Sequence, residues 1–263
     1  MKQGSSSIWR VGAACIAIGV TSLAAAQSDH NNVDAGRPLR FDDASSIAFR
    51  ERALEFGFSL EAFRRRASNY GFKAEYKFGF AKNQDLGVTF DPQFDGSKDR
   101  FDFGDVELAY FNGVRREIDD SPALAYRIEL GLPTGRDSRG VHGKFRGIAT
   151  RTLRQYDKVH LNLDLETSSN PEPDERRYTF GAVLGYTNPL GYPRQFDQTM
   201  LAEFAVQQSR KKGEGFVGTL GIGLRRQLTP QTVFDIGIQS DVFATGGADR
   251  SPFRLSIGYS IGF

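Results

Sequence analysis

Ionisable side chains recur at alternate positions of this sequence, opposite apolar side chains of the same segments. In residues 157–167, His160 and Asp164 share one face while Leu161 and Leu163 share the other. Charges of both signs on one face can line a hydrated passage and sort small solutes by their local field. They can equally pair with one another and fill a closed interior. The residues predicted to line this interior are Glu55, Lys73, Glu75, Lys77, Asp105, Glu107, Arg127, Glu129, His160, Asp164, Glu203, Arg225, Asp235, Asp241 and Arg254.

Hydrolytic chemistry would need a histidine beside a nucleophilic serine and an orienting acid or amide. Beyond the N-terminal segment the histidines are His30, in a polar stretch before the first strand, His142, in a loop, and His160. His160 shares its face with Asn162 and Asp164 and has no serine two positions away. We therefore expect His160 to be hydrogen-bonded to its neighbours in the interior, and we predict no catalytic residue.

Other site chemistries find no support in the sequence. Cys15 is the single cysteine, no two histidines stand at ligand spacing, and no calcium-loop pattern occurs, so we expect no metal site. Gly218, Gly221 and Gly223 lie within one strand with no helix after it, which favours sheet curvature over phosphate or cofactor binding. A formal net charge of +2 gives no support for a nucleic-acid partner.

Strands with a period of two would position these side chains. In the last segment Phe253, Leu255 and Ile257 lie on one face, and Arg254 and Ser256 lie on the other. About twelve segments follow this template, and an even number is typical of single-chain bacterial barrels. The predicted strands are residues 51–62, 69–80, 85–91, 101–112, 122–132, 143–153, 157–167, 177–187, 198–208, 215–226, 231–242 and 252–263.

The sequence thus predicts an all-β chain, an antiparallel up-and-down transmembrane β-barrel of about twelve strands. Its 22 Phe, 9 Tyr and 29 Gly suit strands and tight turns. Alternation alone would also fit a soluble β-sandwich, in which the apolar face forms the core. A strand of about ten residues tilted by about 40° rises about 25 Å, which matches the apolar band of an outer membrane. Short connections alternating with longer polar ones favour the membrane barrel as well.

The N-terminal residues predict export. Lys2 and Arg10 precede the uncharged stretch Val11–Ala26, which ends in the small residues Ala24–Ala26, and this is the pattern of a cleaved signal peptide. We expect the protein to be exported in this way to the outer membrane of a Gram-negative cell. The predicted divisions are a signal peptide (1–26), a periplasmic N-terminal arm (27–50) and the barrel (51–263).

Two features predict partners. Tyr259, Ile261 and Phe263, on the apolar face of the final strand, resemble the C-terminal signal that the barrel-assembly machinery recognises. The basic runs Arg64–Arg66 and Arg210–Lys212 fall in predicted outer loops, where they either contact anionic lipopolysaccharide or are simply solvated. The expected partners are therefore outer-membrane lipid and lipopolysaccharide, the assembly machinery and a small-molecule solute.

Several short motifs occur in an order that resembles a known family. They are Gly36–Ala44, Leu54–Gly57, Phe103–Leu108, Leu130–Gly135 and His160–Asn162. Together they are similar to the bacterial outer-membrane barrel family named for the MetA pathway of phenol degradation, over nearly all of the chain after the signal peptide. The resemblance implies a barrel connected with the uptake of aromatic compounds, and it implies no particular catalytic or binding residue.

These observations predict a passive channel for small solutes, and the family resemblance adds aromatic or hydrophobic solutes. The alternative is a closed barrel with a structural or surface-interaction role. An outer-membrane enzyme is the least favoured class, because His160 lacks a nucleophilic partner.

Overall fold

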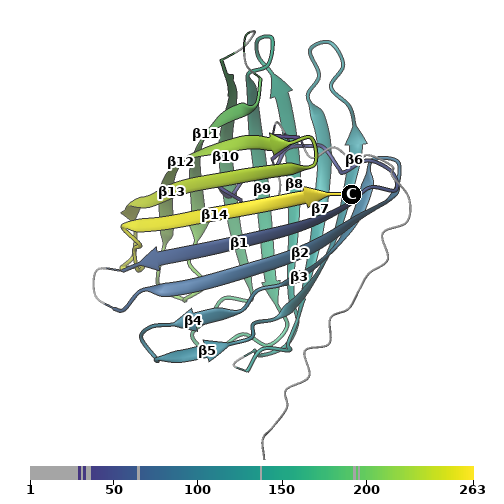
Figure 1. The fold of residues 1–263 in the computed structure, drawn as a ribbon. Helices are drawn as coiled ribbons and strands as arrows, with labels where there is room; N and C mark the ends of the chain where they lie inside the picture. The colour runs from purple at the N-terminus through teal and green to yellow at the C-terminus, as the bar shows by residue number, and fades with distance from the viewer. Residues whose placement is uncertain are drawn as a thin grey trace, which may run out of the picture.

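The computed structural model describes residues 29–263, except residues 31, 34–36, 64–65, 137, 192–193 and 195. The predicted signal peptide therefore lies outside the described residues. Within them the chain forms one antiparallel sheet of 14 strands (Figure 1). No helix in this part of the chain is long and apolar enough to cross a membrane.

Twelve of the strands form the wall of a barrel. These strands are β1 (Arg52–Ala62), β2 (Asn69–Ala81), β3 (Gln84–Phe90), β6 (Val106–Arg115), β7 (Ala123–Leu132), β8 (His142–Thr152), β9 (Lys158–Ser168), β10 (Tyr178–Leu190), β11 (Gln198–Gln208), β12 (Phe216–Thr229), β13 (Thr232–Ala244) and β14 (Phe253–Gly262). Each pairs with its neighbours along the chain, and β1 closes the wall by pairing with both β2 and β14. The remaining strands, β4 (Gln93–Asp95) and β5 (Arg100–Asp102), form a small hairpin. In this hairpin β4 also pairs with the first residues of β2.

The predicted strands correspond one to one with the barrel strands, and all but one agree within three residues at each end. The exception is the predicted strand 101–112, which is wrong at its start. The structure assigns Arg100–Asp102 to β5 and begins β6 only at Val106. Gly104 separates the two with a φ of +73°, a left-handed conformation that breaks an extended run and that glycine adopts readily.

Polarity is inverted relative to a soluble sheet protein. In β9 the leucines at 161, 163 and 165 are 38–55% exposed on the outer face, whereas His160 and Asn162 are fully buried on the inner face. An exposed apolar face is unfavourable in water and favourable against lipid, so this pattern is that of a membrane-spanning barrel. The alternative of a soluble sandwich is excluded by the closed sheet with its polar interior.

The two rims of the barrel differ in their connections. The inner rim, defined by the ends of β1 and β14 at Arg52 and Gly262, carries the short turns, including the two residues between β2 and β3. In that turn Asn83 has a φ of 60°, as tight hairpins require. The outer rim carries the longer connections and the β4–β5 hairpin. The last strand is fully integrated, since Phe263 exchanges two backbone hydrogen bonds with Arg52 beyond the end of β14.

The N-terminal arm lies in a different place from the one predicted. We expected residues 27–50 to stand in the periplasm, but the described residues from Arg37 to Ile47 make contacts with inward-facing side chains of the barrel. Leu39 and Phe41 are among the most deeply buried side chains of the protein. The arm lies inside because a barrel of about twelve strands is too wide for its own side chains to fill.

Candidate functional site

The structure places fourteen of the fifteen predicted interior residues on the inner side of the wall, to different depths. Those that are buried are Glu55, Glu75, Lys77, Arg127, Glu129, His160, Asp164, Glu203, Arg225, Asp235 and Asp241. Lys73, Glu107 and Arg254 are half-buried in the same interior. Asp105 stands apart at the outer rim, where it accepts hydrogen bonds from the Gly135 amide and the Ser138 hydroxyl.

The arm begins its path through the interior at Arg37. The Arg37 guanidinium lies 2.5 Å from a Glu55 carboxylate oxygen and donates to Ser260 Oγ on β14. Lys77 Nζ lies 2.9 Å from the other oxygen of Glu55. A buried carboxylate is stable only when it is paired and hydrogen-bonded. The arm therefore supplies a charge that the wall itself needs.

Inward-facing glycines make room for the arm along several strands. A Cβ atom added at Gly57 would approach Arg37 Cδ to 2.8 Å, and one added at Gly223 would approach Pro38 to 3.0 Å. At Gly185 on β10, an added Cβ would lie 2.5 Å from the ring of Phe41. The wall thus carries a groove of missing side chains in which the arm lies, and we call these three positions the glycine seat.

The glycine seat gives a first testable prediction. Gly185→Ala is expected to displace Phe41 and to lower the free energy of unfolding by about 1–3 kcal/mol, as overpacking of a buried site does. Urea unfolding in lipid vesicles would measure this loss. Gly147→Ala is the matched control, because an added Cβ at Gly147 meets nothing within 4 Å. Equal stability of the two variants would show that Phe41 is not held against β10.

Asp42 is the centre of a second buried ion network. Its carboxylate lies 3.1 Å from Arg146 Nη1 and 3.7 Å from Arg127 Nε. Arg146 also donates twice to Asp164, at 2.6 and 2.7 Å, in the bidentate geometry that makes such pairs strong. Backbone contacts fix the same stretch, since the Asp42 amide donates to Asn162 and the Asn162 amide nitrogen donates back to the Asp42 carbonyl. The arm is thereby bound to the wall at β7, β8 and β9.

His160 lies beneath the arm rather than beside a nucleophilic serine. Its ring nitrogens lie 3.0 Å from Thr150 Oγ1 and 3.2 Å from Thr187 Oγ1, and its ring faces Phe41 at 5.0 Å between centroids. We expected hydrogen bonds with its neighbours in the interior, and the observed partners are these two threonines on the flanking strands. The fully buried imidazole serves to pack the arm.

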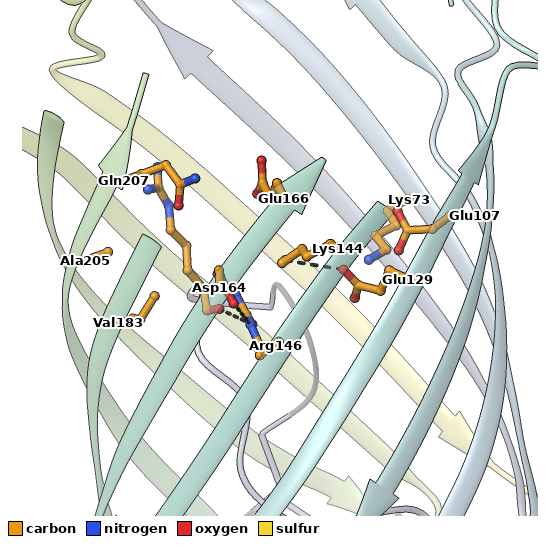
Figure 2. A pocket seen from close by; sticks show the side chains of 11 residues that line it. Lys73, Glu107, Glu129, Lys144, Arg146, Asp164, Glu166, Val183, Ala205 and Gln207 are labelled. Atoms are coloured by element: carbon orange, nitrogen blue, oxygen red, sulfur yellow. Dashed lines mark hydrogen bonds and ion pairs between the residues drawn. The ribbon is translucent and has the colours of Figure 1, made fainter. Parts of the chain in front are cut away.

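A cavity of about 400 Å³, which we call the outer cavity, lies between the arm and the outer rim. Arg146 and Asp164 form its floor, and its walls come from opposite sides of the barrel (Figure 2). Val183, Ala205 and Gln207 stand on one side, while Lys73 and the residues near it stand on the other. The ionisable residues that line it are Arg40, Lys73, Glu107, Glu129, Lys144, Arg146, Asp164 and Glu166.

A cavity of about 450 Å³, which we call the inner cavity, lies on the other side of the arm. It is lined by Ala44, Ser45 and Ser46 of the arm and by wall residues near the inner rim, among them Arg115 and Lys158. The outer and inner cavities share no lining residue, so residues 40–44 and the network around Asp42 stand between them. The arm therefore passes between the two cavities.

Sequence reasoning missed two parts of this site. Lys144 and Arg146 alternate with apolar residues in a predicted strand, so the same period of two could have identified them. The arm residues Arg40 and Asp42 carry no such signal, because the arm is irregular and its register is set only by contacts with the wall. Among the described residues, no group of three or more His, Cys, Asp or Glu side chains could hold a metal ion.

The predicted basic loop clusters are partly neutralised. Arg64 and Arg65 lie outside the described residues, and Arg66 pairs with Asp249 at 3.3 Å. Arg210 pairs with Glu166 at 3.2 Å, and Lys212 Nζ donates to the Pro173 carbonyl. Contact with lipopolysaccharide stays a prediction.

His30 joins the start of the described arm to the inner rim, which predicts a pH effect. Its ring nitrogens lie 2.8 Å from Thr199 Oγ1 and 3.1 Å from the Phe196 carbonyl. Burial lowers the pKa of His30 below its ordinary value, with Asp29 opposing the shift. The stabilisation is therefore fully present above pH of about 6.5 and is lost as the pH falls below that value.

Acidification should accordingly loosen this end of the arm. Hydrogen exchange of the arm amides, corrected for intrinsic rates, should show less protection below pH of about 6 than above pH of about 7. His30→Gln should remove most of this difference. If the unaltered protein shows equal protection at both pH values, the His30 contact does not hold the arm.

Comparisons with known proteins place the fold. No known family model matches the sequence, and no curated protein matches it. Among solved structures, the chain resembles the COG4313 outer membrane channel from Pseudomonas putida F1, with a TM-score of 0.65 and 13% identity over 88% of this chain and 100% of that one. The fold is that of outer-membrane channels.

Two porin structures support the same assignment. The chain resembles the NanC porin with a TM-score of 0.57 and 11% identity, over 80% of this chain and 98% of that one. It resembles the KdgM porin with a TM-score of 0.54 and 11% identity, over 80% and 99% of the two chains. At these identities the likeness establishes the barrel fold alone. The resemblance to the phenol-degradation family stays a prediction.

Proposed function

We propose that this protein is an outer-membrane channel for the passive diffusion of small solutes. The observation that carries the proposal is the membrane-spanning barrel whose polar interior holds a cavity on either side of a folded-in arm. Its likeness to solved outer-membrane channels supports both the location and the role. We propose further that its final strand is recognised by the barrel-assembly machinery through Tyr259, Ile261 and Phe263, and that its outer loops contact lipopolysaccharide.

Small polar solutes suit the interior better than aromatic ones. Eight of the eleven residues that line the outer cavity are ionisable, and Val183 and Ala205 are its apolar members. An apolar molecule would displace the solvation of these charges without replacing it, which is unfavourable. The link to aromatic compounds that the family resemblance implies thus finds no support in the walls of this cavity.

Single-channel recording in planar lipid bilayers tests the proposal. Purified, folded protein should give small stepwise currents, and liposomes that contain it should swell in small polar solutes but not in large oligosaccharides. Silent bilayers with well-folded protein would overturn the channel function. That outcome would favour a closed barrel held by the ion networks around Glu55 and Asp42.

A further inference from the structure

The outer cavity is lined by one cation and one anion that form no direct ion pair in the part of the chain that the structure describes. Three of its charge pairs are satisfied: Arg146 with Asp164, Lys144 with Glu129 at 3.4 Å, and Glu166 with Arg210 at 3.2 Å. Lys73 lies 3.7 Å from Glu75. Among the described residues, neither the Arg40 guanidinium nor the Glu107 carboxylate has a hydrogen bond or an ion pair within 4 Å.

Arg40 is held in a way that leaves its guanidinium available. Its backbone amide donates to Glu203 Oε2 at 2.7 Å, and its carbonyl accepts from Arg146 Nη1 at 2.7 Å. Both main-chain groups are thus fixed to the wall, at β11 and β8. The side chain nevertheless borders the cavity and is only half-buried. An arginine whose main chain is anchored and whose guanidinium has no direct partner is suited to bind a carboxylate with two parallel hydrogen bonds.

Glu107 borders the same cavity from the wall of the barrel. It lies on β6, whereas Arg40 belongs to the arm and is anchored through its main chain to β11 and β8. Figure 2 shows Glu107 beside Lys73 on one wall, facing Val183, Ala205 and Gln207 across the cavity. The Arg40 and Glu107 side chains therefore border the same cavity, one from the arm and the other from the wall.

From this arrangement we propose that the outer cavity binds small zwitterions, molecules with a carboxylate at one end and an ammonium group at the other. The carboxylate binds Arg40 and the ammonium group binds Glu107, while Val183 and Ala205 contact the carbon chain. Four basic and four acidic residues line the cavity, so its charge balance disfavours ligands with a net charge of either sign. Its volume of about 400 Å³ lies within the usual range for small-molecule sites. The proposal rests on the proposed function in that this site would lie on the path of the solute.

Calorimetric titration of the folded barrel in detergent tests the proposal without requiring an open channel. The probe is ε-aminocaproic acid, and caproic acid and n-hexylamine each keep only one of its two charged ends. We expect the zwitterion to bind at least about tenfold more tightly than either single-ended probe, since each charge-assisted contact is worth about that factor or more. Equal affinities for the three probes, or no binding of the zwitterion, would overturn the proposal.

Variants assign each end of the probe. Arg40→Gln should reduce zwitterion affinity about tenfold or more and abolish the binding of caproic acid, while Glu107→Gln should do the same for n-hexylamine. Arg226→Gln, which alters an exposed arginine at the inner rim, should bind all three probes like the unaltered protein. Circular dichroism confirms that each variant is folded. Unchanged zwitterion affinity in folded Arg40→Gln and Glu107→Gln would place the ligand elsewhere. Silent bilayers together with zwitterion binding would overturn the channel and leave the binding site intact.

Discussion

Deletion of residues 29–44 is expected to raise the single-channel conductance several-fold. The described residues from Arg37 to Ala44 lie inside the barrel, and residues 40–44 stand between the outer and inner cavities. A barrel of about twelve strands without this segment would enclose a continuous aqueous space, because its own side chains do not reach across it. Planar bilayer recordings of the deleted and full-length proteins at the same salt concentration provide the measurement.

A covalent lock provides the control for this deletion. Phe41→Cys combined with Gly185→Cys places two sulfurs where an added Cβ at Gly185 would already touch Phe41. The predicted mature chain has no other cysteine, since Cys15 falls in the signal peptide. With the disulfide formed, the double-cysteine variant should have the same low conductance as the full-length protein. With the disulfide reduced, its conductance should be equal or higher. If the deletion leaves conductance unchanged, the arm is not the barrier to flow.

The wall of the barrel was largely predictable from the sequence, because the alternation of apolar and polar residues within each strand indicates which face of that strand points to lipid. The alternation of His160, Leu161 and Asn162 fixes which side chains face lipid and which face inward, whatever the rest of the chain does. The prediction was wrong where one residue interrupts the extended conformation of a predicted strand. Gly104, with its positive φ, divides the predicted strand 101–112 into the end of β5 and the start of β6.

The arm could not be predicted in this way, because nothing local specifies its position. Pro38, Leu39 and Phe41 show no repeating pattern, and their partners lie on strands more than one hundred residues later in the chain. The available signal was indirect. Inward-facing glycines such as Gly185 and Gly223 were interpreted as aids to curvature or passed over, whereas they make the space in which the arm lies.

Arg146→Met is expected to have the largest effect on stability, with a loss of about 3–5 kcal/mol in the free energy of unfolding. The guanidinium satisfies Asp164 through two hydrogen bonds, lies 3.1 Å from Asp42, and donates to the Arg40 carbonyl. Asp42 and Asp164 are 1% and 7% exposed, so water compensates only part of the lost charge. Urea unfolding in lipid vesicles would measure the loss, and faster hydrogen exchange of the arm amides would show that the arm has detached.

The cause of this loss is the unpaired acid, and a second substitution tests that statement. Arg146→Met leaves the carboxylates of Asp42 and Asp164 without this cation. Adding Asp164→Asn removes one of these two charges and should recover a substantial part of the stability, since loss of one partner costs more than loss of both. Arg226→Met is the matched control, because Arg226 is exposed and its pair with Asp197 at 3.7 Å should contribute no more than about 1 kcal/mol. If the double variant is as unstable as Arg146→Met alone, packing of the long side chain rather than its charge holds the arm to β8.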